Sequence, residues 1–201
     1  MPAAAFFGTA RSMAVNAVSA GRALHVSREL LPDDILGRFS PNKQRNQLTV
    51  YLVFDVSGSM RGEPLREAKE AAQEFIRVLQ PDNLTHIGIM TVANEAKIIH
   101  SPSSEADALA EAIESIKIGY GQGNLGEPFA LLNLELRHTP GDKSAVVMAD
   151  GRWVRPEIAV DNAKICHRNG IDVISVGFGN QNISFLKDIA SAGRDSIYAP
   201  R

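Results

Sequence analysis

Asp55, Ser57 and Ser59 place a carboxylate and two hydroxyls at alternate positions directly after an apolar run, Leu48–Phe54. The run has the composition of a strand buried on both faces, and a stretch with helical periodicity begins near Pro64. Open α/β sheets bind ligands in the loops at the carboxyl ends of their strands. Because Mg²⁺ prefers oxygen ligands, this pattern indicates a site for a hard divalent cation.

Two further loops extend the pattern. Asp150 and Gly151 end a second apolar segment, and Asn124 to Gly126 close a glycine-rich loop. The D-x-S-x-S sequence that begins at Asp55 resembles the metal-ion-dependent adhesion site of von Willebrand factor type A (VWA) domains. The two other loops are similar to the second and third loops of that site. The strand and helix order of the family can be followed from about residue 47 to residue 198.

The resemblance implies a metal site built from Asp55, Ser57, Ser59 and Asp150. In the family the two serines usually bind the metal directly, and the aspartates often act through water or hydrogen bonds. The expected cofactor is Mg²⁺ or Mn²⁺, with one coordination position left for an acidic side chain of a partner protein. The function implied is therefore metal-dependent protein binding.

The second loop departs from the family pattern. Gly123 stands where the family has a threonine whose hydroxyl can bind the metal, so that one oxygen ligand is missing. Ala149 also replaces a frequent threonine, but the neighbouring carboxylate is kept. The sequence therefore predicts a partly degenerate metal site. We expect the binding rim to include Gln122, Gly123, Asn124 and Trp153.

Trp153 permits two interpretations. It follows Asp150 closely and, if exposed beside Arg152 and Arg155, it is typical of a binding hot spot. If buried, it packs against the start of the next helix. The sequence alone leaves both interpretations open.

The remaining pattern predicts an α/β fold, because strand-like and helix-like segments alternate. We expect a doubly wound, mostly parallel, Rossmann-like sheet with one antiparallel edge strand and helices on both faces. The predicted strands are 47–55, 85–92, 96–101, 144–149, 172–177 and 196–199, and the predicted helices are 64–79, 105–116, 127–136, 155–168 and 183–192.

Residues 1–45 form a predicted N-terminal extension, and residues 46–201 the VWA-like domain. The extension contains several arginines and no acidic residue before Glu29, a composition similar to that of a transit peptide. A targeting segment, an assembly arm for self-association and a part of the domain core remain three open alternatives.

An enzyme is the alternative class of function. Residues 121–126 read G-x-G-x-x-G, with Asp150 downstream, as in a dinucleotide-binding loop, but that fingerprint must follow a strand and Leu109–Ile116 has helical spacing. Asp55 could accept a phosphoryl group, but haloacid-dehalogenase-like phosphatases need a second carboxylate where Ser57 stands. We therefore expect no enzyme, and a nucleotide- or phosphate-handling α/β protein is the alternative.

The overall composition indicates which classes of partner and which cellular location to expect. The 201 residues carry a formal net charge of −2 with mixed signs, which does not favour nucleic acid. A single cysteine favours a reducing compartment, and no apolar run is long enough to span a bilayer. Without a recognisable secretion signal we expect a cytoplasmic protein. The resemblance suggests an AAA+ ATPase or a larger complex as the intracellular partner.

Overall fold

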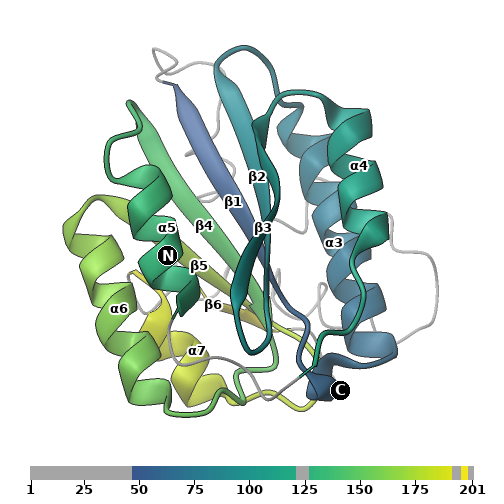
Figure 1. Ribbon diagram of the computed structural model, residues 1–201, viewed down its shortest axis with the longest axis vertical. Helices are drawn as coiled ribbons and strands as arrows, with labels where there is room; N and C mark the ends of the chain where they lie inside the picture. Colours follow the sequence, from purple (N-terminus) through teal and green to yellow (C-terminus); the bar gives the residue numbers. More distant parts are fainter. Residues whose placement is uncertain (1–46, 121–126, 192–195, 199–201) are drawn as a thin grey trace, which may run out of the picture.

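A six-stranded sheet forms the centre of the molecule (Figure 1). The computed structural model describes residues 47–120, 127–191 and 196–198. The strand order is β3-β2-β1-β4-β5-β6, and every neighbouring pair is parallel except β2 and β3. The strands are β1 (Leu48–Asp55), β2 (Thr85–Val92), β3 (Ala96–Ser103), β4 (Asp142–Ala149), β5 (Ile171–Gly177) and β6 (Ser196–Tyr198).

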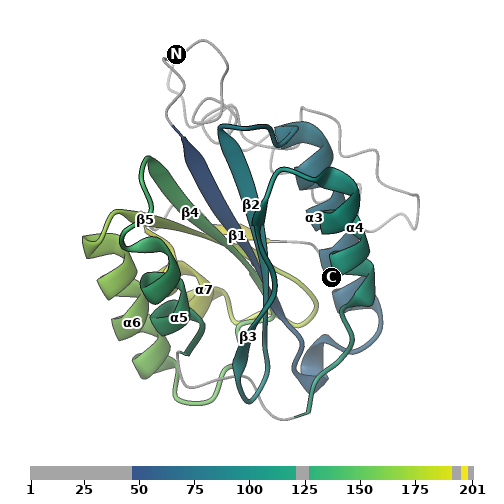
Figure 2. The ribbon, with the colours of Figure 1, turned by 45° about the horizontal axis from the view of Figure 1, so that its top comes forward.

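Helices cover both faces of this sheet. On one face lie α3 (Glu63–Leu79) and α4 (Ala106–Ser115); on the other lie α5 (Glu127–Leu136), α6 (Pro156–Arg168) and α7 (Ile183–Ile189) (Figure 2). A short 3-10 turn, η1 (Gly58–Met60), connects β1 to α3. The predicted fold class, including the antiparallel edge strand β3, is confirmed.

The apolar run of β1 supplies both cores. Val50, Leu52 and Phe54 belong to the cluster beneath α3 and α4, whereas Tyr51 and Val53 belong to the cluster beneath α5, α6 and α7. Successive side chains of a strand point to opposite faces, so a strand with helices on both sides needs apolar residues at consecutive positions. All five side chains are fully buried.

Gly88 of β2 makes room for one of these side chains. Tyr51 and Gly88 are paired in register across β1 and β2, and a Cβ atom added to Gly88 would lie 2.5 Å from Tyr51 Cε1. The phenol of Tyr51 reaches past the glycine and donates a hydrogen bond to Glu135 Oε2 at 3.3 Å. Burial, and then the nearby Glu135 carboxylate, raise the pKa of Tyr51 above its ordinary value. Glycine is therefore required at position 88 by the neighbouring ring.

The observed element ends differ from the predicted ones by a few residues. The largest difference concerns α7, which ends at Ile189 rather than at residue 192. Ala190 adopts an extended conformation, and the Ser191 backbone N–H then donates to Val173 O at 3.0 Å, which stops the helix. The N-terminal extension lies outside the described residues, so that the domain boundary at residue 45 stays a prediction.

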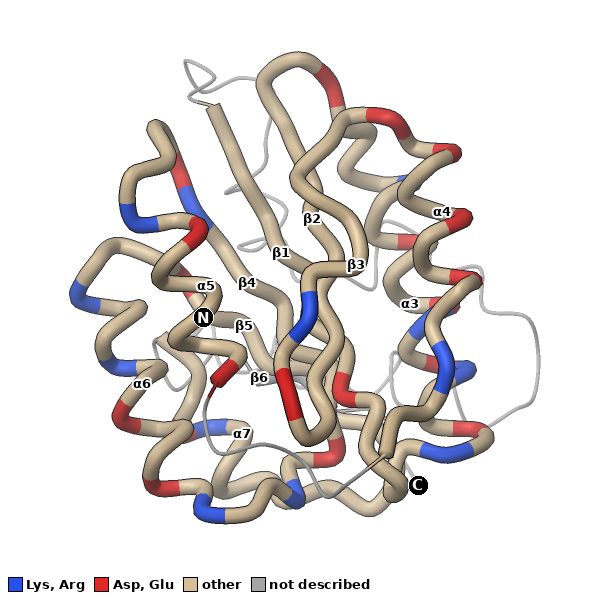
Figure 3. Tube along the Cα trace, viewed as in Figure 1, with Lys and Arg blue, Asp and Glu red and all other residues tan. Residues whose placement is uncertain are grey.

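The exposed helices carry both signs of charge (Figure 3). On α3, for example, Arg66 contacts Glu63 and Glu70, one turn away on either side. Such exposed pairs contribute little to stability. Within the described ranges, none of the helices has the length and apolar character needed to cross a bilayer.

Candidate functional site

The carboxyl ends of β1 and β4 bring the two predicted aspartates to one edge of the sheet. The strands are parallel neighbours, with Phe54 opposite Met148, and both end at the lower side of the sheet in Figure 1. Asp55 is the last residue of β1, and Asp150 directly follows β4. The two carboxylates are close enough for Asp150 to affect the ionisation of Asp55. The sequence placed these residues nearly one hundred positions apart, and the parallel β1–β4 pairing brings them together.

Asp55 is fully buried, and both of its oxygens accept hydrogen bonds. Oδ1 accepts from the Ser57 backbone N–H at 2.8 Å, and Oδ2 accepts from the Trp153 indole Nε1 at 2.7 Å. A carboxylate has about four acceptor positions, and the Ser57 hydroxyl also hydrogen-bonds to it. The side chain is thus held at both oxygens and keeps acceptor capacity for a cation.

The two serines lie on the turn that follows. Ser57 Oγ and Ser59 Oγ are 3.1 Å apart and share a hydrogen bond. The η1 turn produces this proximity, because the Met60 backbone N–H donates to Ser57 O at 3.0 Å and closes the loop. Ser57 is buried and Ser59 is exposed. The hydroxyl pair therefore extends from the buried carboxylate towards solvent.

Asp150 begins the loop after β4, where its side chain is almost fully buried. Its Oδ1 accepts the Arg152 backbone N–H at 3.0 Å, and its carbonyl accepts the Asn182 backbone N–H at 2.7 Å. Gly151 has φ +73°, and an added Cβ would lie 2.9 Å from Asn182 O. Only glycine fits this turn without strain, and the turn fixes the Asp150 carboxylate.

The environment of Asp55 opposes its ionisation. Burial is the main cause and raises its pKa above the ordinary value, and the negative charge of Asp150 acts in the same direction. Hydrogen bonds from Ser57 and Trp153 lower the pKa and offset part of this effect. A bound cation would lower the free-energy cost of ionising Asp55 in this buried position, because it neutralises the charge.

Trp153 is not on the exposed rim, and the hot-spot interpretation of its ring is wrong. The side chain is only 5% exposed and packs between two phenylalanines, with ring centroids 6.0 Å from Phe129 and 5.3 Å from Phe185. The indole N–H is directed at Asp55 instead. The sequence carried no signal for this bond, because the two phenylalanines that orient the ring come from α5 and α7. The other rim residues, Gln122, Gly123 and Asn124, lie outside the described residues.

The donor chemistry fits a hard divalent cation. All side-chain donors here are oxygens, which suit Mg²⁺ or Mn²⁺ better than a soft metal. Over the described ranges, no group of three or more His, Cys, Asp or Glu residues could hold a metal. The two carboxylates therefore need the hydroxyls of Ser57 and Ser59 to complete a site.

The dinucleotide alternative lacks its strand. Residues 121–126 are preceded by α4 and by an irregular segment, residues 116–120, in which the Gly119 backbone N–H donates to Val56 O at 2.8 Å. A dinucleotide fingerprint sits between a strand and a helix. The helix α5 follows the loop as expected, but no strand leads into it.

A strand-end carboxylate followed by two hydroxyls, with a second strand-end carboxylate beside it, is the arrangement that the family resemblance implied. The sequence model of the von Willebrand factor type A domain matches residues 49–200. The chain belongs to this family. Its members are in general interaction modules without enzymatic activity.

Individual proteins agree with this assignment. A UPF0353 protein of Nocardia farcinica is 32% identical over 164 residues, which cover 68% of this chain and 47% of that protein. The chain thus spans about half the length of this relative. Manganese-loaded TRAP protein of Plasmodium vivax shares the fold with a TM-score of 0.67 at 16% identity, covering 78% of this chain and 69% of that one.

The predicted cytoplasmic location is wrong. An aerotolerance-related membrane protein of Bacteroides fragilis shares the fold with a TM-score of 0.66 at 19% identity, covering 77% of this chain and 91% of that one. That protein is described as a membrane protein, and this finding is the one that overturns the cytoplasmic prediction. The single cysteine was a poor guide to location.

Proposed function

We propose that this chain is a protein-binding module in which a Mg²⁺ or Mn²⁺ ion captures an acidic side chain of a partner. The observation that carries the proposal is the convergence of Asp55, Ser57 and Ser59 on one loop, with Asp150 beside them at the end of the neighbouring strand. A cation bound there would accept a partner carboxylate as an additional ligand.

Each residue has a distinct part in this proposal. The Ser57 and Ser59 hydroxyls are neutral donors 3.1 Å apart, so that they add oxygen ligands without adding charge. Asp55 and Asp150 supply negative charge from buried positions. With only two carboxylates near it, a divalent cation keeps its affinity for a third one supplied by a partner.

The loops around the site also suit an acidic partner. Arg61 follows the η1 turn, and Arg152 follows Asp150; both side chains are exposed. Positive charge at the rim of an interface steers and orients an acidic partner. Arg155 adds a second guanidinium to the loop after β4, where it lies 3.6 Å from Glu157.

Water proton relaxation with Mn²⁺ tests the proposal on the protein alone. Bound Mn²⁺ should enhance the relaxation rate of water, and Asp55→Ala should abolish that enhancement. Added glutamate should lower the enhancement by displacing a metal-bound water, whereas glutamine at the same concentration should not. Absence of enhancement with the wild-type protein, or an equal response to the two amino acids, would contradict the proposal.

The proposal also includes the cellular location of the module. We propose that it acts in association with a membrane, supported by the Bacteroides fragilis protein of the same fold, which is described as a membrane protein. An AAA+ ATPase partner and self-assembly through residues 1–45 stay predictions from the family resemblance and from the composition of the extension.

A further inference from the structure

We propose that Trp153 is a positioning residue for the metal site: its indole N–H holds the Asp55 carboxylate in the orientation in which it serves the cation. The inference rests on the proposed function, because it assigns a role at the same site. It concerns a residue that does not itself bind metal and that acts through its hydrogen bond to Asp55.

The geometry of the carboxylate supports this role. Two N–H donors from different loops, the Ser57 backbone and the Trp153 indole, bond to different oxygens of Asp55 at 2.8 Å and 2.7 Å. One donor alone would leave the carboxylate free to rotate about the Cβ–Cγ bond of Asp55. With donors on both oxygens its plane is set, and part of its acceptor capacity remains for the site.

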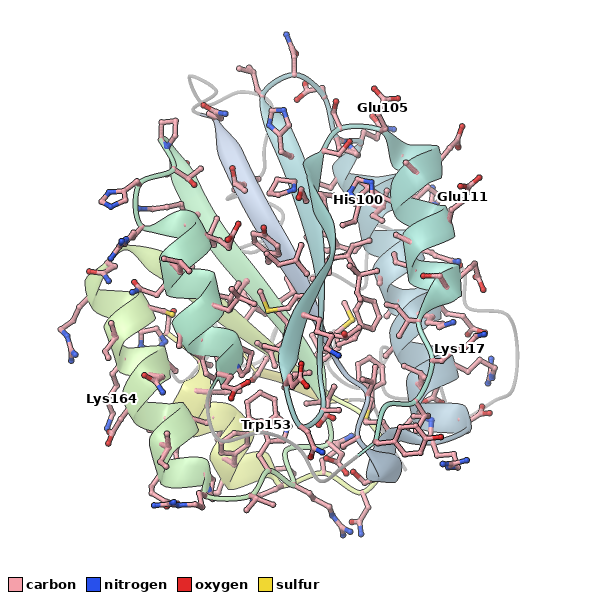
Figure 4. All side chains as sticks on the ribbon, in the orientation of Figure 1. His100, Glu105, Glu111, Lys117, Trp153 and Lys164 are labelled. Carbon is pink, nitrogen blue, oxygen red and sulfur yellow. The ribbon has the colours of Figure 1, made fainter. Side chains whose placement is uncertain are left out.

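The indole is itself held firmly. Its ring lies between Phe129 at the start of α5 and Phe185 on α7, in tilted contacts of 45° and 51°. Figure 4 shows Trp153 in the lower part of the view, below α5 and next to α7. Aromatic groups in such contacts have little rotational freedom, so that the N–H direction is fixed by the packing.

Core packing alone does not account for this arrangement. A phenylalanine could occupy the space between Phe129 and Phe185 without bringing a polar N–H into the core. Burying an N–H is favourable only when it has a partner, and a bond to a charged acceptor is stronger than one to a neutral acceptor. Here the acceptor is the buried strand-end carboxylate of Asp55, and the Trp153 N–H offsets part of the cost of its charge.

Trp153→Phe tests the role by removing the N–H and keeping an aromatic ring. Loss of a hydrogen bond to a charged group should weaken Mn²⁺ binding about tenfold, measured by electron paramagnetic resonance of free Mn²⁺. The matched control is Leu136→Ala, a buried position of the same core cluster at the other end of α5, which leaves Phe129, Phe185 and the indole N–H in place. It should lower the melting temperature but change the Mn²⁺ affinity less than twofold.

Nuclear magnetic resonance gives a second readout on the unmodified protein. Trp153 is the only tryptophan of the chain, so the indole N–H yields one ¹H–¹⁵N signal. Saturating Mg²⁺ should shift this signal while its slow exchange with solvent persists, because the bond to Asp55 is kept in the metal-bound state. Asp55→Asn should remove the response to Mg²⁺.

The outcomes separate the two proposals. If wild-type protein binds no Mn²⁺, the proposed function fails and Trp153 has no metal site to position. If wild-type binds and Trp153→Phe binds equally well, only the positioning role is overturned. An equal loss of affinity in Leu136→Ala would assign the effect to general loosening of the core and overturn the positioning role as well. Should Trp153→Phe not fold, an indole signal that ignores Mg²⁺ in the wild-type protein would still refute the inference.

Discussion

Ser57 and Ser59 place their hydroxyl oxygens 3.1 Å apart on the turn after β1, one buried and the other exposed. Two hydroxyls at this separation can both contact one cation, or they can bond to each other in its absence. Metal binding is therefore expected to replace the hydrogen bond between the two hydroxyls with contacts to the cation.

Removal of either hydroxyl should weaken metal binding. We expect Ser57→Ala and Ser59→Ala each to reduce Mn²⁺ affinity by at least about tenfold, as changes around metal sites commonly do. Isothermal titration calorimetry measures the effect. Ser115→Ala is the matched control, because Ser115 is the last residue of α4, outside the site, and its hydroxyl donates to Ala112 O. Unchanged affinity in both site variants would place the metal elsewhere.

The stability of the metal-free protein should depend on pH through Asp55. Burial raises the folded-state pKa of Asp55 above its ordinary value, so the folded state binds a proton more readily than the unfolded state. The contribution of Asp55 to the free energy of unfolding is then fully present below the ordinary pKa and is lost as pH rises through the folded-state pKa. Thermal melts in EDTA should show this as a difference between wild type and Asp55→Ala that changes with pH.

With metal present, the pH dependence of stability that arises from Asp55 should have the opposite sign. Protons and the cation compete for the Asp55 carboxylate, so that stabilisation by millimolar Mg²⁺ should shrink as pH falls. Ligand stabilisation follows mass action, and a weaker apparent affinity gives a smaller shift in melting temperature. A shift that is constant with pH would show that the metal does not contact an ionising carboxylate.

Gly88→Ala should destabilise the sheet. The new methyl group would lie 2.5 Å from Tyr51 Cε1, and forcing an extra group into a packed core costs about 1–3 kcal/mol. Chemical denaturation measures the change in the free energy of unfolding. In a Tyr51→Leu background the ring is absent, and the same substitution should cost less, which a double-mutant cycle would reveal as a coupling energy.

Gly123→Thr should tighten Mn²⁺ binding if its hydroxyl restores the ligand that the VWA resemblance predicts at this position. Gly123→Val is the matched control, since valine has the same shape without the oxygen. Glycine often occupies backbone conformations in which a β-branched residue is strained. Equal weakening by threonine and valine in folded variants would mean that Gly123 serves the backbone rather than an incomplete metal site.

Much of the fold was determined by the local sequence. Every position of the Leu48–Phe54 run except Thr49 is strongly apolar, which predicts a strand buried on both faces, and β1 indeed supplies both cores. The helix predicted at 127–136 is observed at those bounds, because Glu127 and Pro128 suit a first helical turn. The spacing of Asp55, Ser57 and Ser59 was also sufficient to place the three residues on one loop after the strand.

Only the tertiary structure decided which residues surround that loop. Asp150 lies beside Asp55 because β4 pairs directly with β1, an arrangement set by long-range packing of the sheet. Trp153 turns inward because Phe129 and Phe185, from helices on either side of it along the chain, enclose its ring. Local sequence determines strand and helix periods, whereas the direction of a side chain in a loop depends on partners that only the folded chain brings near.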